Sequence, residues 1–167
     1  APKIQRWWRY TIEPDAQPKS EPALVEELLE ILTRATARRL VADVPLGVFL
    51  SGGLDSSTIA ALAGQKAAPH RLQTFTIGFR EPSFDESVFA ARVADFLKTD
   101  HHVDTLSLDG ALSALPQIFD RLDEPQGDSS LLPTWLLCRF ARTKVTVALS
   151  GDGGDELFGG YNRHTWG

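Results

Sequence analysis

Short apolar runs alternate with helical patterns along most of the chain. The runs cover residues 46–50, 74–79, 101–106 and 145–149, and each has the length of a buried strand rather than of a helix. Apolar residues spaced three and four apart predict helices over residues 21–40, 56–66, 84–97, 107–119 and 130–142. Strands that alternate with helices in this way form parallel sheets with helices on both faces. We therefore predict an α/β fold built on a twisted parallel sheet.

Two of the predicted strands end in the same tripeptide. Residues 50–52 and residues 149–151 both read Leu-Ser-Gly, at the ends of the first and fourth apolar runs. In parallel sheets, ligands bind beyond the carboxyl ends of the strands, at the point where the strand order reverses. We therefore expect the two loops to meet there and to form one binding site.

The loop after the first strand, residues 51–57, has the composition of a phosphate site. Gly52 and Gly53 let the main chain approach a ligand closely. The helix that follows presents free N–H groups to the same point, and the serines of the loop add hydroxyl donors. The loop holds no Lys or Arg, so Asp55 beside a phosphate requires a bridging Mg²⁺. A helix cap is the alternative role for Asp55.

The loop after the fourth strand is acidic and rich in glycine. Asp152, Asp155 and Glu156 lie within five residues, among the five glycines of residues 150–161. Three carboxylates in one cleft repel each other unless a cation or a hydrogen-bonded partner lies among them. This favours Mg²⁺ or a cationic group, with a solvated acidic loop as the alternative. Neither loop fits a Walker P-loop, a nucleophile elbow or a dinucleotide fingerprint.

Together the two loops resemble the synthetase domain of glutamine-dependent asparagine synthetases. The phrases that match are residues 24–45, 50–57, 74–79, 123–125 and 149–161. The resemblance implies an adenine-nucleotide alpha-hydrolase-like fold, that of the PP-loop ATP pyrophosphatases, with its four strands in the order 3-2-1-4. It also implies that residues 20–167 are the N-terminal portion of the synthetase domain. Residues 1–19, with three prolines, are expected to be a tether.

The resemblance implies a reaction and a role for each matched residue. The side-chain carboxylate of aspartate attacks the α-phosphorus of ATP, which releases pyrophosphate, and ammonia from glutamine then displaces AMP. The residues implied to bind pyrophosphate and its metal are Ser51, Gly52, Gly53, Asp55 and Ser56. The residues implied to contact the adenosine are Leu50, Ile77, Ser150 and Gly151. Asp152, where the family more often has Glu, and Asp155 are the expected catalytic residues, and Asp55 and Asp155 the expected Mg²⁺ ligands. Glu156 is expected to pair with a base.

Other functions stay open at this point. An enzyme that adenylates another carboxylate, such as a tailoring amidotransferase or a β-lactam synthetase, would carry the same loops. A non-catalytic nucleotide-binding module is the second alternative. The family's glutaminase half begins with a nucleophilic Cys, whereas this chain begins with Ala1, and no Lys here matches the catalytic Lys that the family places downstream. We therefore expect a piece of a longer protein, inactive alone, whose partners are a glutaminase domain and, at full length, a second copy in a homodimer.

The composition of the chain excludes some classes of protein and some kinds of partner. The chain has 167 residues, 43% of them hydrophobic, and a net charge of −5, which argues for one globular domain and against a nucleic-acid partner. No apolar run is long enough to cross a membrane, so a cytoplasmic location is expected. Cys138, the single cysteine, excludes an internal disulfide and is expected in the core. His101 and His102 are neighbours on a strand and point to opposite faces, which makes a shared metal site unfavourable.

Overall fold

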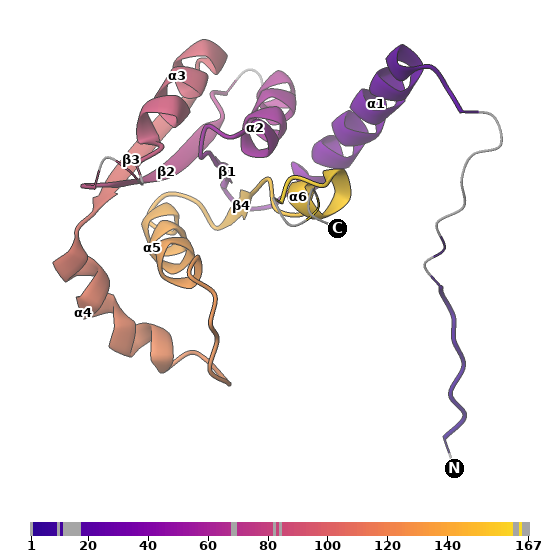
Figure 1. Ribbon diagram of the computed structural model, residues 1–167. Helices are drawn as coiled ribbons and strands as arrows, with labels where there is room; N and C mark the ends of the chain where they lie inside the picture. The colour runs from indigo at the N-terminus through magenta and orange to yellow at the C-terminus, as the bar shows by residue number, and fades with distance from the viewer. Residues whose placement is uncertain are drawn as a thin grey trace.

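A four-stranded parallel sheet forms the centre of the molecule (Figure 1). A computed structural model gives the structure and describes residues 2–9, 11, 18–67, 70–81, 83, 85–161 and 164. The strands are β1 (Leu46–Phe49), β2 (Gln73–Phe79), β3 (Asp100–Leu106) and β4 (Val147–Leu149), and their order in the sheet is β3-β2-β1-β4. This confirms the predicted fold class and the predicted order of the strands.

The register of the sheet places two loops side by side. Strand β1 pairs with β2 from Gly47 opposite Gln73, and with β4 from Leu46 opposite Val147. The strands that follow β1 in the chain therefore lie on both of its sides, and the order reverses at β1. The loops after β1 and β4 leave the sheet at the same edge, which is where ligands bind in such sheets.

Helices cover both faces of the sheet, as predicted. The helices are α1 (Glu21–Arg39), α2 (Leu54–Lys66), α3 (Ser87–Leu97), α4 (Leu108–Phe119), α5 (Leu131–Ala141) and α6 (Gly154–Phe158). Helices α1, α2 and α3 lie on one side of the sheet, and α4 and α5 on the other (Figure 1). None of the helices in the described part of the chain is both long and apolar enough to cross a bilayer.

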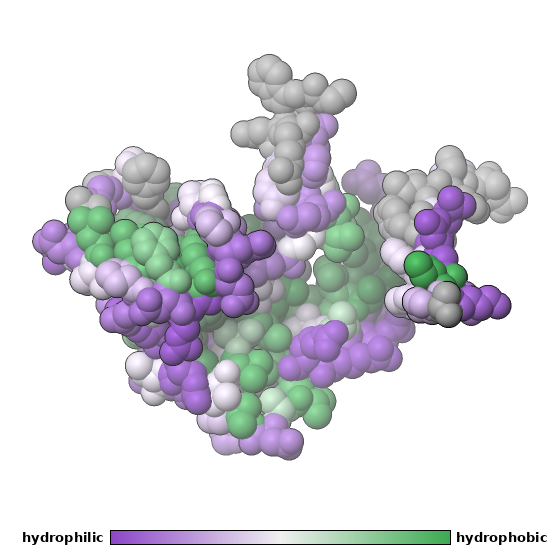
Figure 2. Space-filling model, turned by 90° about the horizontal axis from the view of Figure 1, so that it is seen from below, coloured by the Kyte–Doolittle hydropathy of each residue, from purple (hydrophilic) through white to green (hydrophobic). Residues whose placement is uncertain are grey.

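Separate clusters of buried side chains pack the helices against the two faces of the sheet. On the α2 and α3 face, Val48 of β1 and Leu50, the residue that follows β1, pack against Ala60 and Ala63 of α2. On the α5 face, Phe75 of β2 is fully buried against the end of α5. A third cluster joins α4 to α5. Seen from below, the molecule is hollowed near its centre, with hydrophobic side chains in the depth of the hollow (Figure 2).

Several boundaries differ from the sequence-based predictions, and strand β4 begins at Val147 rather than at residue 145. Helix α2 begins at Leu54 rather than residue 56, because Gly53 is extended and acts as the N-cap. Helix α3 begins at Ser87, where the Asp85 carboxylate accepts hydrogen bonds from the backbone N–H groups of Phe79 and Ser87; the predicted start, Phe84, lies outside the described residues. The second loop contains the short helix α6, which the sequence did not predict.

The N-terminal half of α1 and residues 2–9 are exposed. Helix α1 contacts α2 and buries Thr36, while Leu24, Val25 and Leu29 of its N-terminal half stay more than half exposed. Residues 2–9 run away from the other elements (Figure 1), and the side chain of Trp7 is 92% exposed.

Candidate functional site

A single cleft gathers nearly all of the predicted site residues. It has a volume of about 1050 Å³ and lies at the carboxyl edge of β1 and β4. Its lining includes Leu50, Ser51, Gly53, Asp55, Ser56, Ile77, Ser150, Gly151, Asp152 and Asp155. The two loops therefore meet, as their common position after neighbouring strands predicts.

The two loops are in direct contact, and glycine makes that contact possible. A Cβ atom on Gly151 would lie 2.6 Å from the backbone nitrogen of Ser56, closer than real Cβ atoms approach. A Cβ atom on Gly154 would collide with the carboxylate of Asp55. The loop after β4 thus lies against the first turn of α2, and any side chain at these two glycines would push the loops apart.

Gly52 has a different place from the other predicted residues. Its φ is +85°, and a Cβ atom there would lie 2.6 Å from the backbone nitrogen of Ala90 in α3. It does not line the cleft. Gly52 therefore allows the loop after β1 to turn and to pack against α3, and the phosphate role predicted for it remains a prediction.

Hydroxyl groups hold the shape of the loop after β1. The hydroxyl oxygens of Ser51 and Ser56 lie 2.9 Å apart and share a hydrogen bond. The Ser56 hydroxyl also accepts from the backbone N–H of Ser51 at 3.2 Å, and the Ser51 hydroxyl accepts from the N–H of Gly53 at 3.2 Å. The Thr76 hydroxyl donates to the carbonyl of Leu50. The loop is therefore shaped by its own side chains before any ligand enters.

The carboxylates of the second loop differ in how they are held. The Ser150 hydroxyl donates a 2.7 Å hydrogen bond to Asp152, and the Tyr161 hydroxyl donates a 2.5 Å hydrogen bond to Glu156.

Asp55 and Asp155 are half-buried at the starts of α2 and α6. Among the described residues, no group of three or more His, Cys, Asp or Glu could hold a metal ion by itself. Mg²⁺ usually takes one or two protein carboxylates together with phosphate oxygens and water, and Asp55 with Asp155 fit that pattern.

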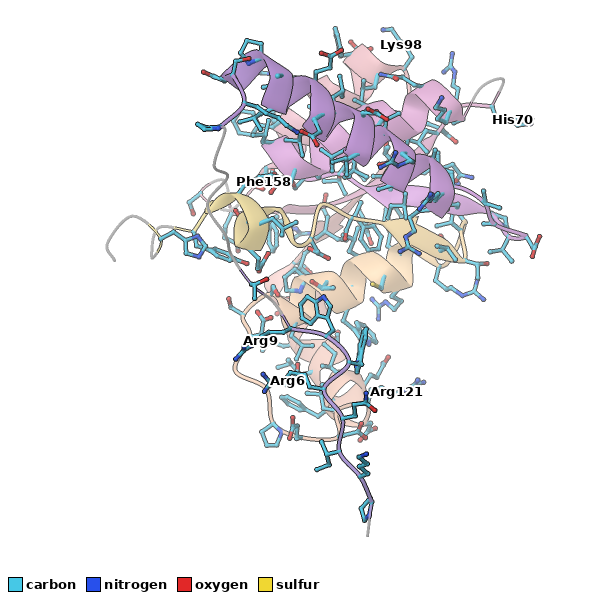
Figure 3. All side chains as sticks on the ribbon, turned by 90° about the vertical axis from the view of Figure 1, so that its right-hand side faces the viewer. Arg6, Arg9, His70, Lys98, Arg121 and Phe158 are labelled. Atoms are coloured by element: carbon cyan, nitrogen blue, oxygen red, sulfur yellow. The ribbon has the colours of Figure 1, made fainter. Side chains whose placement is uncertain are left out.

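The charged residues that line the cleft are all acidic. Its lining contains Asp55, Glu86, Asp128, Asp152, Asp155 and Glu156, and no Lys, Arg or His among the residues that the structure describes. The cations labelled in Figure 3, such as Arg6, Lys98 and Arg121, lie on the N-terminal segment and at the outer ends of helices. An anionic ligand can enter such a cleft only with cations that offset its charge.

Sequence reasoning missed one wall of the cleft. Asp128, Ser130, Pro133, Thr134 and Leu137, from α5 and the loop before it, line the cleft. Two hydrogen bonds of 2.8 Å, from the hydroxyl and the backbone N–H of Ser130, reach Asp128, and they hold the pKa of this carboxyl below its ordinary value. The sequence motif at 123–125 pointed to this region, but nothing local showed that α5 packs beneath β2.

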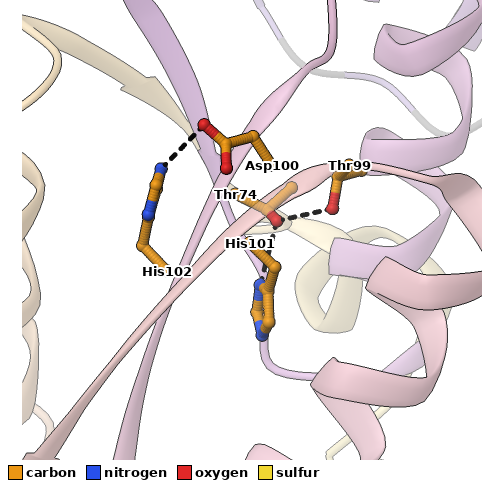
Figure 4. Close-up of polar contacts among 5 residues, drawn as sticks. All are labelled: Thr74, Thr99, Asp100, His101 and His102. Carbon is orange, nitrogen blue, oxygen red and sulfur yellow. Dashed lines mark hydrogen bonds and ion pairs between the residues drawn. The ribbon is translucent and has the colours of Figure 1, made fainter.

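The two histidines of β3 lie outside the cleft and face opposite sides of the strand, as predicted (Figure 4). His101 Nδ1 lies 2.9 Å from the Thr74 hydroxyl, and His102 Nε2 lies 3.3 Å from Asp100. Burial, and then the neighbouring His102, lower the pKa of His101. Because the two imidazole rings face opposite sides of β3, they are not placed to bind one metal ion together.

The prediction for Cys138 was wrong. This residue is exposed on α5 rather than in the core, because Leu136 and Ala141 supply the buried positions of that helix. Partial burial still raises the pKa of the Cys138 thiol.

The fold defines the general class of the protein. The chain superposes on the glutamine-dependent NAD⁺ synthetase of Acinetobacter baumannii, solved in complex with ADP, with a TM-score of 0.59 and 22% identity over 89% of this chain and 29% of that one. It matches the NMN synthetase of Francisella tularensis with a TM-score of 0.57 and 17% identity, over 81% and 58% of the two chains. The fold is that of the PP-loop adenine-nucleotide alpha-hydrolases.

The sequence then gives the family. The family model for asparagine synthase matches residues 27–167, and the chain belongs to that family. It is 40% identical over 163 residues to a putative glutamine-hydrolysing asparagine synthetase of Methanocaldococcus jannaschii, covering 97% of this chain and 31% of that protein. It is 34% identical to asparagine synthetase 1 of Bacillus subtilis, covering 96% and 27%. The chain thus spans about a third or less of the length of these relatives.

Proposed function

We propose that the cleft binds ATP with Mg²⁺ and joins AMP to the side-chain carboxylate of aspartate, ahead of amidation by ammonia derived from glutamine. Membership of the asparagine synthase family supports this proposal. The observation that carries it is the contact between the two loops: Gly151 lies against the backbone of Ser56, and Gly154 against the carboxylate of Asp55. That contact brings neutral donors and carboxylates together at the edge of the sheet where a nucleotide binds.

The loop after β1 would hold the departing pyrophosphate. The first turn of α2 presents free N–H groups and the positive end of the helix dipole toward the cleft. Ser51 is exposed and lines the cleft. Asp55 and Asp155 would hold Mg²⁺, which when bound offsets the negative charge of the phosphates. Charge that develops on the leaving group is then met by groups already in position, and such stabilisation is usually the largest single contribution to catalysis.

The reacting groups would lie between that loop and Asp152. An oxygen of the aspartate side chain forms a bond to the α-phosphorus, and the bond from that phosphorus to the bridging oxygen breaks, so pyrophosphate leaves with the electron pair. The hydrogen bond from Ser150 fixes the Asp152 carboxylate. Ile77 lines the cleft with an apolar side chain, which suits the adenosine, whereas the Leu50 side chain is buried in the core. Ammonia then attacks the acyl carbon, and AMP leaves.

The proposal is tested in the protein at its natural length, supplied with ATP, Mg²⁺, aspartate and either ammonia or glutamine. Pyrophosphate is measured by a coupled assay and the amide product by mass spectrometry. We expect pyrophosphate release that depends on aspartate, and asparagine as the product. Pyrophosphate release with a different carboxylic acid, and none with aspartate, would identify a related amidotransferase or a β-lactam synthetase instead.

A further inference from the structure

The α5 wall of the cleft has no part in the phosphate chemistry described above. Helix α5 lies on the opposite side of the sheet from α2, whose first turn belongs to the phosphate loop (Figure 1). The wall brings one charged group, Asp128, together with the hydroxyl residues Ser130 and Thr134. A group bound there would lie across the cleft from the phosphate loop.

The Asp128 carboxylate is held in one orientation. Its Oδ1 atom accepts both hydrogen bonds from Ser130, at 2.8 Å each, so Oδ2 is left for another partner. The same bonds keep the pKa of Asp128 low, and the group is therefore an anion at neutral pH. No Lys, Arg or His of the described chain forms an ion pair with it.

Three of the acids on the two loops differ from Asp128 in their surroundings, whereas Glu86, another acid of the lining, is the N-cap of α3. Asp55 lies against the loop of Gly154, Asp152 accepts from Ser150, and Glu156 accepts from Tyr161. These three belong to the two loops that meet. Asp128 comes from a third segment, so its charge is placed for a different part of the ligand.

The groups around Asp128 suit an ammonium better than a metal ion. An ammonium has three N–H donors, and the wall offers a carboxylate and the hydroxyl groups of Ser130 and Thr134 as acceptors. A Mg²⁺ ion held by one or two carboxylates also takes phosphate oxygens, and the phosphate loop lies across the cleft from this wall. At about 1050 Å³ the cleft is at the upper end of the range of roughly 300–1,000 Å³ that is usual for ligand sites.

We infer that Asp128 binds the α-ammonium group of an amino-acid acceptor and so makes the cleft select amino acids over plain carboxylic acids. This inference rests on the function proposed above, because it names the part of the acceptor that the α5 wall recognises. Asp128 is a specificity residue in this account. It touches the substrate at a point remote from the atoms that react.

The test compares Asp128→Asn with Asp120→Asn in the protein at its natural length. Asparagine has the shape of aspartate and keeps the oxygen that Ser130 binds, so the turn before α5 is retained while the charge is lost. Asp120 is an exposed acid at the end of α4 that does not line the cleft. Aspartate is compared with succinate, which lacks only the amino group and is assayed as an inhibitor.

We expect Asp128→Asn to lower kcat/KM for aspartate by about 10- to 100-fold, the usual effect of losing a charge-assisted hydrogen bond. The KM for ATP, the Mg²⁺ concentration that gives half-maximal activity and the inhibition constant of succinate should each change by less than about twofold, and the melting temperature should stay that of the wild type. Calorimetry with aspartate and a non-hydrolysable ATP analogue should show the same loss of affinity. Asp120→Asn should behave as the wild type.

Several outcomes would overturn the inference. Equal losses for aspartate, succinate and ATP would make Asp128 a structural turn residue, and a raised Mg²⁺ requirement would make it a metal ligand. A wild-type protein that uses acceptors without an amino group equally well would also overturn it, although adenylation itself would stand. The proposed function itself fails if the wild type releases no pyrophosphate with any carboxylic acid. In that case the role of Asp128 is judged by calorimetry alone, and aspartate that binds Asp128→Asn as tightly as the wild type would overturn the inference.

Discussion

Gly151 lies so close to the backbone nitrogen of Ser56 that a Cβ atom on the glycine would be 2.6 Å from it. The two residues are far apart in the sequence, and their contact joins the loops after β1 and β4 into one cleft. Most of what is proposed for this protein depends on that contact.

Replacing Gly151 with alanine should therefore separate the loops. We expect Gly151→Ala to weaken ATP binding at least tenfold and to lower the free energy of unfolding by about 1–3 kcal/mol, the usual cost of overpacking. Calorimetry and urea denaturation measure the two effects. Gly64→Ala is the matched control, since nothing lies within 4 Å of a Cβ atom at this position in α2; it should leave binding intact and stabilise the fold by up to about 1 kcal/mol.

The hydroxyl of Ser56 should matter for the shape of the phosphate loop. Ser56→Ala removes the acceptor of the Ser51 N–H and the partner of the Ser51 hydroxyl, and we expect a loss of about 1–3 kcal/mol in the free energy of unfolding together with weaker ATP binding. Thr58→Ala removes another hydroxyl of α2, one that bonds only to the helix backbone at Leu54. If both variants bind ATP equally well, the loop does not depend on this network.

Asp55 should supply the Mg²⁺ dependence of nucleotide binding. We expect Asp55→Asn to bring the affinity for ATP with Mg²⁺ down to the affinity without it, because the amide is a poor Mg²⁺ ligand. Asp109→Asn is the control, since Asp109 is likewise an acid in the first turn of a helix but does not line the cleft. A loss of affinity in Asp55→Asn that is the same in Mg²⁺ and in EDTA would contradict a metal role for Asp55.

His101 should make the fold less stable in acid. Because its folded-state pKa is lowered, the unfolded chain binds more protons in the interval between the two pKa values, and stability there rises with pH. The contribution is complete above the ordinary histidine pKa of about 6.5 and is lost as the pH falls through the lowered value. Urea denaturation between pH 8 and pH 5 should show a smaller loss for His101→Asn than for the wild type. His70→Asn, at an exposed position, should keep the full loss.

The strands and the two loops could be predicted because their signals are local. Each strand is a short apolar run, and each loop holds its glycines, serines and acids within a few residues. Since parallel strands end at the same edge of a sheet, the loops after β1 and β4 were expected to meet. The loops do meet, and every residue predicted for the site except Gly52 lines the cleft, while the roles of these residues stay predictions. Gly52, with its positive φ and close approach to Ala90, serves the packing of α3.

The missed features depend on tertiary packing. Helix α6 is short and is bounded by Gly153 and Gly159, both at positive φ, so its glycines suggested only a loop. Asp128 and Thr134 reach the cleft because α5 packs beneath β2, which no local pattern reveals. Cys138 was expected in the core because it is apolar and helical, but its place on α5 faces outward.

The most direct test of the account is a calorimetric titration of the protein with ATP, in Mg²⁺ and in EDTA, with GTP as the comparison. If the two loops form one nucleotide site, ATP binds saturably at one site per chain, Mg²⁺ is required, and GTP binds at least tenfold more weakly. A folded protein of natural length that shows no saturable binding of ATP in Mg²⁺ would contradict the central claim.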